Sequence, residues 1–438
     1  MPTANLTPLL ESLREARSRT LALVNDLNDE QMIGPRLDIV NPLRWEIGHV
    51  AWFQEYWLLR HLLGRSPTLS TGDSLFDSAR IAHDTRWDLP LLSKAETIAY
   101  AGKILDRVFD EYQQDDADSS PGSEDAGYFL SLTLFHEDMH AEAIAYTRQT
   151  LGYAAPEFTQ ALIHETPREN ISGKPGDAFI AGGTFLVGSA NDQRFVFDNE
   201  RDAHEVQLGP FAISRTAVTN AEFAAFVDDN GYQRRELWSG AGWRWRESNK
   251  AEHPVYWERD GSKWWRRAFD EVVPLEDSLP VVHVNWYEAE AFCRSAHRRL
   301  PTEAEWEFAA AADPATGERT SPKRIFPWGN EPATPRRDNL DWQNIGPVEV
   351  RLLAEGDSAL GCRQMIGNVW EWTASDFLPY PGFVAGPYKE YSAPWFGDHK
   401  VLRGGCWTTR SRLIHNAYRN FYKPDRRDVW AGFRTCGL

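Results

Sequence analysis

The stretch that decides the fold of the N-terminal third is residues 126–150, AGYFLSLTLFHEDMHAEAIAYTRQT, followed by a glycine at position 152. We expect one helix here, ended by Gly152, because glycine readily takes the left-handed conformation that closes a helix. The segment before it, residues 113–125, is rich in Asp, Ser, Pro and Gly and predicts a loop.

Three more helices are predicted upstream of that stretch. Apolar residues from Leu9 to Leu27 recur at roughly helical spacing and form one face. The pair Asn41-Pro42 is a start signal for a second helix, and Ser93 with Glu96 has the spacing of a capping box that starts a third. These helices cover about residues 9–27, 43–63 and 94–112. Together with residues 126–150 they predict a four-helix bundle.

The pattern changes after about Pro156. Short alternating segments, separated by Gly, Pro, Asn and Asp turns, predict strands at residues 184–187, 205–208 and 281–285. Helices are predicted at residues 220–227, 286–296 and 302–311. We therefore expect a second domain of irregular α+β structure, with domains at residues 1–155 and 156–438 and a linker near 153–175.

Composition excludes some functions for this chain of 438 residues. Its formal net charge of −17 argues against nucleic acid or an anionic membrane as a partner. No signal peptide and no membrane-spanning run is evident. The cysteines Cys293, Cys362, Cys406 and Cys436 are widely spaced and form no C-x-x-C pair. We expect a cytoplasmic protein with reduced thiols, and a monomer.

Three histidines are candidate metal ligands. His136 and His140 lie four residues apart, so both imidazoles project from one helix face. With Glu137 they spell H-E-x-x-H, the zinc-protease pattern, although a lone pair with this spacing can equally be a surface pair. His49 lies in an apolar helix of the same bundle and could complete a three-histidine site with open positions. Imidazoles bind zinc, copper or iron, so these residues alone do not identify the metal.

The second half carries several longer motifs. They are Gly182-Gly183-Thr184-Phe185, Phe197-Asp198-Asn199-Glu200, Val218-Thr219-Asn220-Ala221-Glu222-Phe223, Arg299-Leu300-Pro301-Thr302-Glu303-Ala304-Glu305-Trp306, Gly367-Asn368-Val369-Trp370-Glu371-Trp372 and Arg403-Gly404-Gly405. Here the chain resembles the sulfatase-modifying, formylglycine-generating fold, which is lectin-like. The first half resembles a DinB-type four-helix bundle. That fusion is similar to the ergothioneine-type sulfoxide synthases, so the expected fold class is α+β with these two parts.

The resemblance implies a non-haem iron enzyme. It implies Fe(2+) on His49, His136 and His140, with hercynine, a sulfur donor and O2 as small-molecule substrates, and a pocket closed by loops of the second domain. Tyr380 corresponds to the family tyrosine that gives a proton or hydrogen atom, although it could equally be a buried turn aromatic. Arg86 corresponds to an arginine that helps hold the donor. The copper-binding cysteine pair of formylglycine-generating enzymes is absent, since only Cys406 follows the glycines.

This sequence departs from the family pattern at positions that bear on the identity of the sulfur donor. In the segment from Arg419 to Arg427, Tyr422 replaces an acidic residue, whereas Arg426 remains, and Asn420 and Phe421 are candidates for the wall of the hercynine pocket. Met139 stands where many relatives have glutamine. These changes resemble the divergent branch of selenoneine synthases, which joins a selenosugar to hercynine through a C–Se bond. We expect a selenosugar donor on this ground, because a phenol pairs less well with an ammonium group than a carboxylate does.

Other functions stay open on the sequence. The same chemistry with cysteine or γ-glutamylcysteine would give an ergothioneine-type synthase. A zinc hydrolase or thiol transferase would use Glu137 to activate water. A lectin-like binding module would need no iron. We expect Glu137 and Asp138 to be exposed or to support the metal ligands rather than act as a base.

Overall fold

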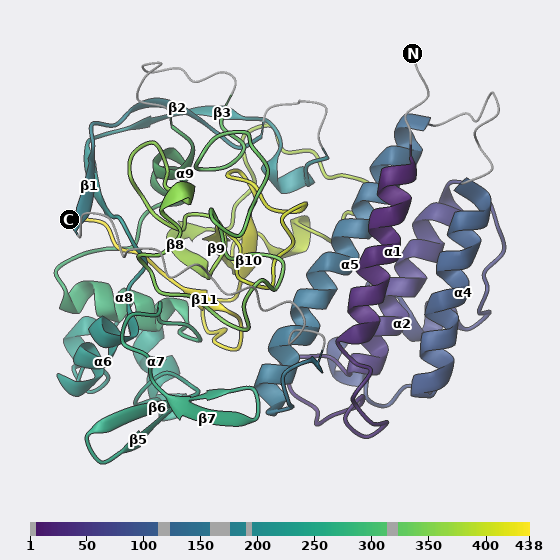
Figure 1. Ribbon diagram of the computed structural model, residues 1–438, viewed down its shortest axis with the longest axis horizontal. Coiled ribbons are helices and arrows are strands. Elements are labelled where there is room, and N and C mark those ends of the chain that lie inside the picture. The colour runs from purple at the N-terminus through teal and green to yellow at the C-terminus, as the bar shows by residue number, and fades with distance from the viewer. Residues whose placement is uncertain (1–5, 113–122, 158–175, 190–194, 313–322) are drawn as a thin grey trace. The chain divides into compact units, whose positions relative to one another are not determined.

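The computed structural model describes residues 6–112, 123–157, 176–189, 195–312 and 323–438. The chain divides into two compact units, Met1–Ala161 and Leu162–Leu438 (Figure 1). Most of the predicted linker and residues 113–122 of the predicted loop lie outside the described residues. Residues 123–125 already belong to a helix, so that part of the loop prediction was wrong.

The first unit is a helical bundle. Its long helices are α1 (Thr7–Ala22), α2 (Leu43–Gln54), α4 (Lys94–Tyr112) and α5 (Ser123–Leu151), and α2 continues into the π-helical η1 (Glu55–His61). The short elements α3 (Gly72–Phe76) and η2 (His83–Thr85) lie between α2 and α4 in sequence. Helix α1 packs on α5, and α2 packs on both α4 and α5 (Figure 1).

A buried polar cluster joins all four long helices. Arg17 of α1 donates to Glu137 of α5 at 2.7 Å, to Gln54 of α2 at 2.9 Å and to the carbonyl oxygen of Ala101 in α4 at 2.5 Å. Gln54 also donates to Glu137 at 2.6 Å. Arg17 and Glu137 are both buried, and each charge is neutralised by the other. Glu137 was expected either to be exposed or to support the metal ligands, and the first of these two placements was wrong. Asp138 is buried as well.

The described residues of the second unit form four small sheets. The central one has the order β10 (Asn420–Tyr422), β9 (Lys400–Arg403), β8 (Trp370–Asp376), β11 (Ala431–Gly432), and only β11 pairs in parallel, with β8. Two antiparallel pairs are β1 (Asp177–Ile180) with β4 (Phe211–Ser214) and β2 (Gly183–Val187) with β3 (His204–Leu208). The strands β5 (Trp257–Asp260), β6 (Lys263–Ala268) and β7 (Glu271–Pro274) form an antiparallel meander.

The α-helices of the second unit begin at residues whose side chains accept a hydrogen bond from the first turn. These helices are α6 (Asn220–Asp228), α7 (Gly240–Asn249), α8 (Trp286–Ser295) and α9 (Glu303–Ala311). Short 3-10 helices are η4 (Asp198–Glu200), η5 (Arg235–Leu237), η6 (Ala354–Gly356) and η7 (Ala393–Trp395). Capping boxes start α6, α8 and α9, as their motifs favour. The α+β fold class is confirmed.

One predicted strand is absent. Residues 281–285 form no strand, because His283 has a positive φ of 60° and Asn285 already caps α8. All four cysteines are buried free thiols. Within the described part of the chain, every helix is too short or too polar to span a bilayer.

Candidate metal centre

The three predicted histidines meet inside the bundle. His49 comes from α2, and His136 and His140 come from α5. One candidate ligand nitrogen from each lies within 4.8 Å of the others. The Nε2 atoms of His136 and His140 are 3.2 Å apart, and the ring of His49 lies 5.0 and 4.9 Å from theirs, centroid to centroid. The three rings therefore converge on one point from two helices.

Aromatic rings hold two of these imidazoles in place. Trp45 and Phe53 lie four residues before and after His49, so one ridge of α2 carries all three. Trp45 stacks on His49 at a centroid distance of 4.6 Å and an interplanar angle of 10°. Phe53 stacks on His136 at 3.7 Å and 9°. The apolar residues around His49 in the sequence thus form the wall of the site.

Hydrogen bonds fix which ring nitrogen faces the site. Nδ1 of His49 lies 2.7 Å from the carbonyl oxygen of Phe76 and donates to it, which leaves Nε2 free of a proton. Nδ1 of His140 bonds to the carboxylate of Glu46. Such partners orient metal-binding imidazoles and raise their basicity. The sequence did not assign these two partners, because neither has a fixed spacing from the histidine it contacts.

Burial keeps the imidazoles of His49 and His136 neutral. Burial lowers the pKa of His49 to about 3, and the charge of His140 acts in the same direction. Burial also lowers the pKa of His136. Burial would raise the pKa of Glu46, but attraction to His140 and the hydrogen bonds of His140 and Asn41 bring it to about 2. Neutral buried nitrogens beside an ionised carboxylate fit a divalent transition-metal ion, since protonated imidazoles bind none.

Arg86 lies in the same unit as the histidines. Its guanidinium is 3.8 Å above the ring of Trp45, and Nη1 donates to Oδ1 of Asn41 at 2.6 Å. The residue is 9% exposed. Its assignment to the donor stays a prediction.

Tyr380 lies in the second unit, in a buried cluster. Its hydroxyl donates to Glu303 at 3.1 Å, and the guanidinium of Arg419 lies 3.9 Å from the ring centroid. Burial raises the pKa of Tyr380, with Arg419 acting in the opposite direction. Its phenol proton is thus directed to a carboxylate. The role of Tyr380 as a proton or hydrogen source stays a prediction.

The remaining predicted residues gather at strand β10 and the turn after it. Phe421 stacks on Phe377 at 4.0 Å, and Arg426 lies 5.1 Å from the ring centroid of Tyr422. Arg426 also makes two hydrogen bonds of 2.7 Å to Asp428, a buried carboxylate that the sequence analysis missed. The Oδ1 atom of Asn420 accepts from the backbone N–H of Phe421. These contacts leave the substrate roles of the four residues as predictions.

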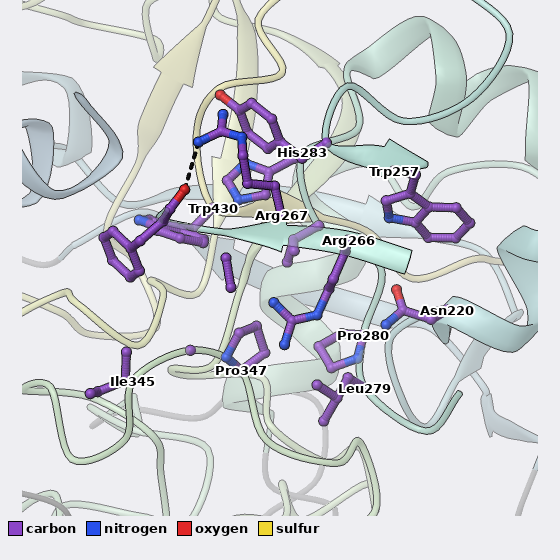
Figure 2. Close-up of a pocket in the computed structure, with 15 residues that line it drawn as sticks. Asn220, Trp257, Arg266, Arg267, Leu279, Pro280, His283, Ile345, Pro347 and Trp430 are labelled. Atoms are coloured by element: carbon purple, nitrogen blue, oxygen red, sulfur yellow. Dashed lines mark hydrogen bonds between the residues drawn. The ribbon is translucent and has the colours of Figure 1, made fainter. Parts of the chain in front are cut away.

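Figure 2 shows a pocket in the second unit, with His283 and Trp430 on one side of it and Leu279 and Pro347 on another. The rings of His283 and Trp430 are 4.4 Å apart, and Tyr256 lies 4.8 Å from His283. Arg267 on β6 donates to the carbonyl oxygen of Phe269 at 2.8 Å. The predicted site residues do not line this pocket. Trp257 and Trp430, which line it, are two of the 19 tryptophans of the chain.

The comparisons with known proteins agree with this architecture. Residues 159–437 match the sulfatase-modifying factor enzyme 1-like domain, and residues 12–144 match the DinB superfamily. The chain is therefore a fusion of a DinB-type bundle, which carries the three histidines, and a domain of the sulfatase-modifying type. Over the full length, the chain belongs to the hercynine oxygenase family.

Two family members and two other proteins illustrate the similarity. Hercynine oxygenase of Mycolicibacterium thermoresistibile is 37% identical, over 98% of this chain and 94% of that protein. Hercynine oxygenase of Mycobacterium tuberculosis is 36% identical, over 97% of each. Formylglycine-generating enzyme of Streptomyces coelicolor is 34% identical over 65% of this chain and 96% of its own. The structure of PvdO from Pseudomonas aeruginosa is 20% identical, with a TM-score of 0.41, and covers 60% of this chain and 99% of that one.

Proposed function

We propose that this protein is an oxygen-dependent enzyme that joins a sulfur or selenium donor to the imidazole carbon of hercynine. The observation that carries the proposal is the convergence of His49, His136 and His140 within a chain that is similar over its whole length to proteins named hercynine oxygenase. The first candidate donor is cysteine or γ-glutamylcysteine, in an ergothioneine-type sulfoxide synthase.

The proposed metal is Fe(2+), held by the three histidines. Bound there, iron supplies the chemistry by which O2 is reduced while the new bond to carbon is made. The protein's own part is to present three ring nitrogens that lie close together. The carbonyl group of Phe76 directs Nδ1–H of His49 outward, and Glu46 does the same for His140. Trp45 and Phe53 restrict the rotation of the rings and exclude water from one side.

Other residues act on substrates in this proposal. Arg86 attracts the carboxylate of an amino-acid donor, because a guanidinium binds carboxylates with two parallel N–H donors. Tyr380 delivers a proton during the reaction and is held by Glu303 until then. Asn420 and Phe421 contribute to the hercynine pocket, where an aromatic ring suits the quaternary ammonium group.

A selenosugar is the second candidate donor, and with it the protein would be a selenoneine synthase. The observation that favours it is at β10, where Tyr422 stands in place of an acid and Arg426 is already paired with Asp428. A phenol can stack on a sugar ring and hydrogen-bond to it. A donor ammonium group would find no carboxylate at position 422.

A zinc hydrolase has less support. In that reaction Glu137 would have to activate water beside the metal. Its carboxylate instead accepts hydrogen bonds from Arg17 and Gln54 inside the bundle. A carboxylate that is fully buried and held by a guanidinium is a poor general base for water.

The test is a competition assay with Fe(II)-loaded protein, hercynine and O2, in which cysteine, γ-glutamylcysteine, a thiosugar and a selenosugar are offered together. Mass spectrometry identifies the adduct. We expect one hercynine adduct that His136→Ala abolishes. His61→Ala is the matched control, because His61 is an exposed histidine at the end of η1, outside the cluster. The adduct formed names the donor, and the absence of every adduct would overturn the proposed function.

A further inference from the structure

A continuous line of hydrogen bonds runs from Arg86 to the third histidine. Nη1 of Arg86 donates to Oδ1 of Asn41 at 2.6 Å. Nδ2 of Asn41 donates to Oε1 of Glu46 at 2.6 Å, and Oε2 of Glu46 accepts from His140. Arg86 therefore reaches His140 through two intervening side chains.

The middle of this line needs a side chain that both accepts and donates a hydrogen bond, and an amide does both. A guanidinium has donors alone, and an ionised carboxylate has acceptors alone. Asn41 accepts from the first with its oxygen and donates to the second with its nitrogen, so its two neighbours fix its orientation. An aspartate at position 41 would place one carboxylate against another, and an aliphatic residue would break both bonds. The two partners of position 41 thus require a side chain that can both accept and donate.

A second path starts from the same guanidinium. Arg86 lies 3.8 Å above the ring of Trp45, and Trp45 stacks on His49. Arg86 is thus connected to two of the three histidines, by hydrogen bonds to His140 and by stacked rings to His49. Glu46 is 2% exposed, so little water competes for its carboxylate.

We infer that Asn41 and Arg86 are positioning residues for the metal centre, which act through Glu46 and Trp45. This inference rests on the proposed function, in which the three histidines bind the metal. Asn41 holds one oxygen of Glu46, so the other stays directed at Nδ1 of His140 and Nε2 stays directed at the site. An anionic donor that draws Arg86 away from Asn41 would loosen this support, so the donor site and the metal site are coupled.

The test uses the full chain and metal ions alone. Affinity for Fe(II) and Co(II) is measured by competition with a chromophoric chelator, and the visible spectrum of the Co(II) form reports the geometry of its ligands. We expect Asn41→Leu, Asn41→Asp and Arg86→Met each to lower affinity about 10- to 100-fold, the range for groups that orient metal ligands. The Co(II) spectrum should shift in all three, and Arg86→Lys should recover part of the affinity.

Arg65→Met is the matched control. Arg65 is an exposed residue of the same unit and pairs with Glu111 of α4, away from the line, so affinity and spectrum should stay unchanged. Thermal melts of the metal-free variants separate loss of folding from loss of positioning. Wild-type affinity and spectrum in folded Asn41→Leu and Arg86→Met would overturn the inference. If His49→Ala and His136→Ala also bind metal like the wild type, the proposed metal centre fails instead.

Discussion

At the residue scale, Gly48 makes room for the residue that orients His49. A Cβ atom at position 48 would lie 2.1 Å from a ring carbon of Phe76, whose carbonyl group accepts from His49. We predict that Gly48→Ala lowers the free energy of unfolding by about 1–3 kcal/mol, as overpacking does, and weakens metal binding. Chemical denaturation and chelator competition measure the two effects.

The matched control is Gly102→Ala on α4. A Cβ atom there meets no heavy atom within 4 Å, so the substitution should be neutral or stabilise by up to about 1 kcal/mol. Equal destabilisation by both substitutions would contradict the prediction, because the effect would then reflect glycine in a helix rather than contact with Phe76.

Asp338 gives a pH-dependent prediction. Burial raises its pKa from 3.8 to about 7, although Thr334 and Gln343 donate hydrogen bonds to its carboxylate. Between these values the folded chain binds more protons than the unfolded chain, so the stability of the wild type falls as the pH rises from about 4 to 7. Relative to Asp338→Asn, we expect a loss of about 1–3 kcal/mol between pH 5 and pH 8.

Unfolding in urea at both pH values checks this expectation. Parallel pH profiles for wild type and Asp338→Asn would show that Asp338 titrates normally and would contradict the prediction.

The sequence identified the three histidines but not the residues around them. Spacing on one helix is enough to place His136 beside His140. Glu46 and Phe76 contact the histidines only because of the way α2, α3 and α5 pack, and a sequence does not contain those distances. The burial of Glu137 was not predicted for the same reason, because its partner Arg17 lies 120 residues away.

At the element scale, the buried Arg17–Glu137 pair contributes strongly to the stability of the folded bundle. Removing one member of a buried ion pair leaves the other charge without compensation, which costs about 3–5 kcal/mol. We therefore predict that Arg17→Met unfolds the bundle at markedly lower temperature. Differential scanning calorimetry measures this.

Arg14→Met, on the same helix, is the comparison. Arg14 pairs with exposed Glu11, and such surface pairs contribute at most about 1 kcal/mol. The prediction fails if the two substitutions have the same effect on the melting temperature.

Where the sequence contains a helix-capping motif, it predicted the start of the helix well. The helix predicted at residues 94–112 has those bounds, and Ser93 and Glu96 form the expected reciprocal hydrogen bonds. The sequence did not predict α7, the β5–β7 meander or the π-helical η1. Their polar, aromatic residues carry no clear period, and their structure depends on contacts such as the guanidinium of Arg267 over Tyr256.

At the scale of the whole molecule, metal binding should stabilise the first unit against unfolding. The histidines belong to α2 and α5, which lie in the Met1–Ala161 unit. We predict that Zn(II) or Fe(II) at 100 times its dissociation constant stabilises this unit by about 2.7 kcal/mol. Hydrogen exchange followed by mass spectrometry should slow in peptides from residues 43–61 and 123–151.

His136→Ala is the control and should remove that protection. Protection that persists in this variant, or that arises only in peptides from the second unit, would place the metal elsewhere.

The four-helix link through Arg17 has a consequence for how the protein matures. Its hydrogen bonds join α1, α2, α4 and α5 through groups other than the three histidines, so the helices that carry the histidines are held together independently of the proposed metal site. Under the proposed function, newly made chains fold in an empty form and take up the metal ion afterwards.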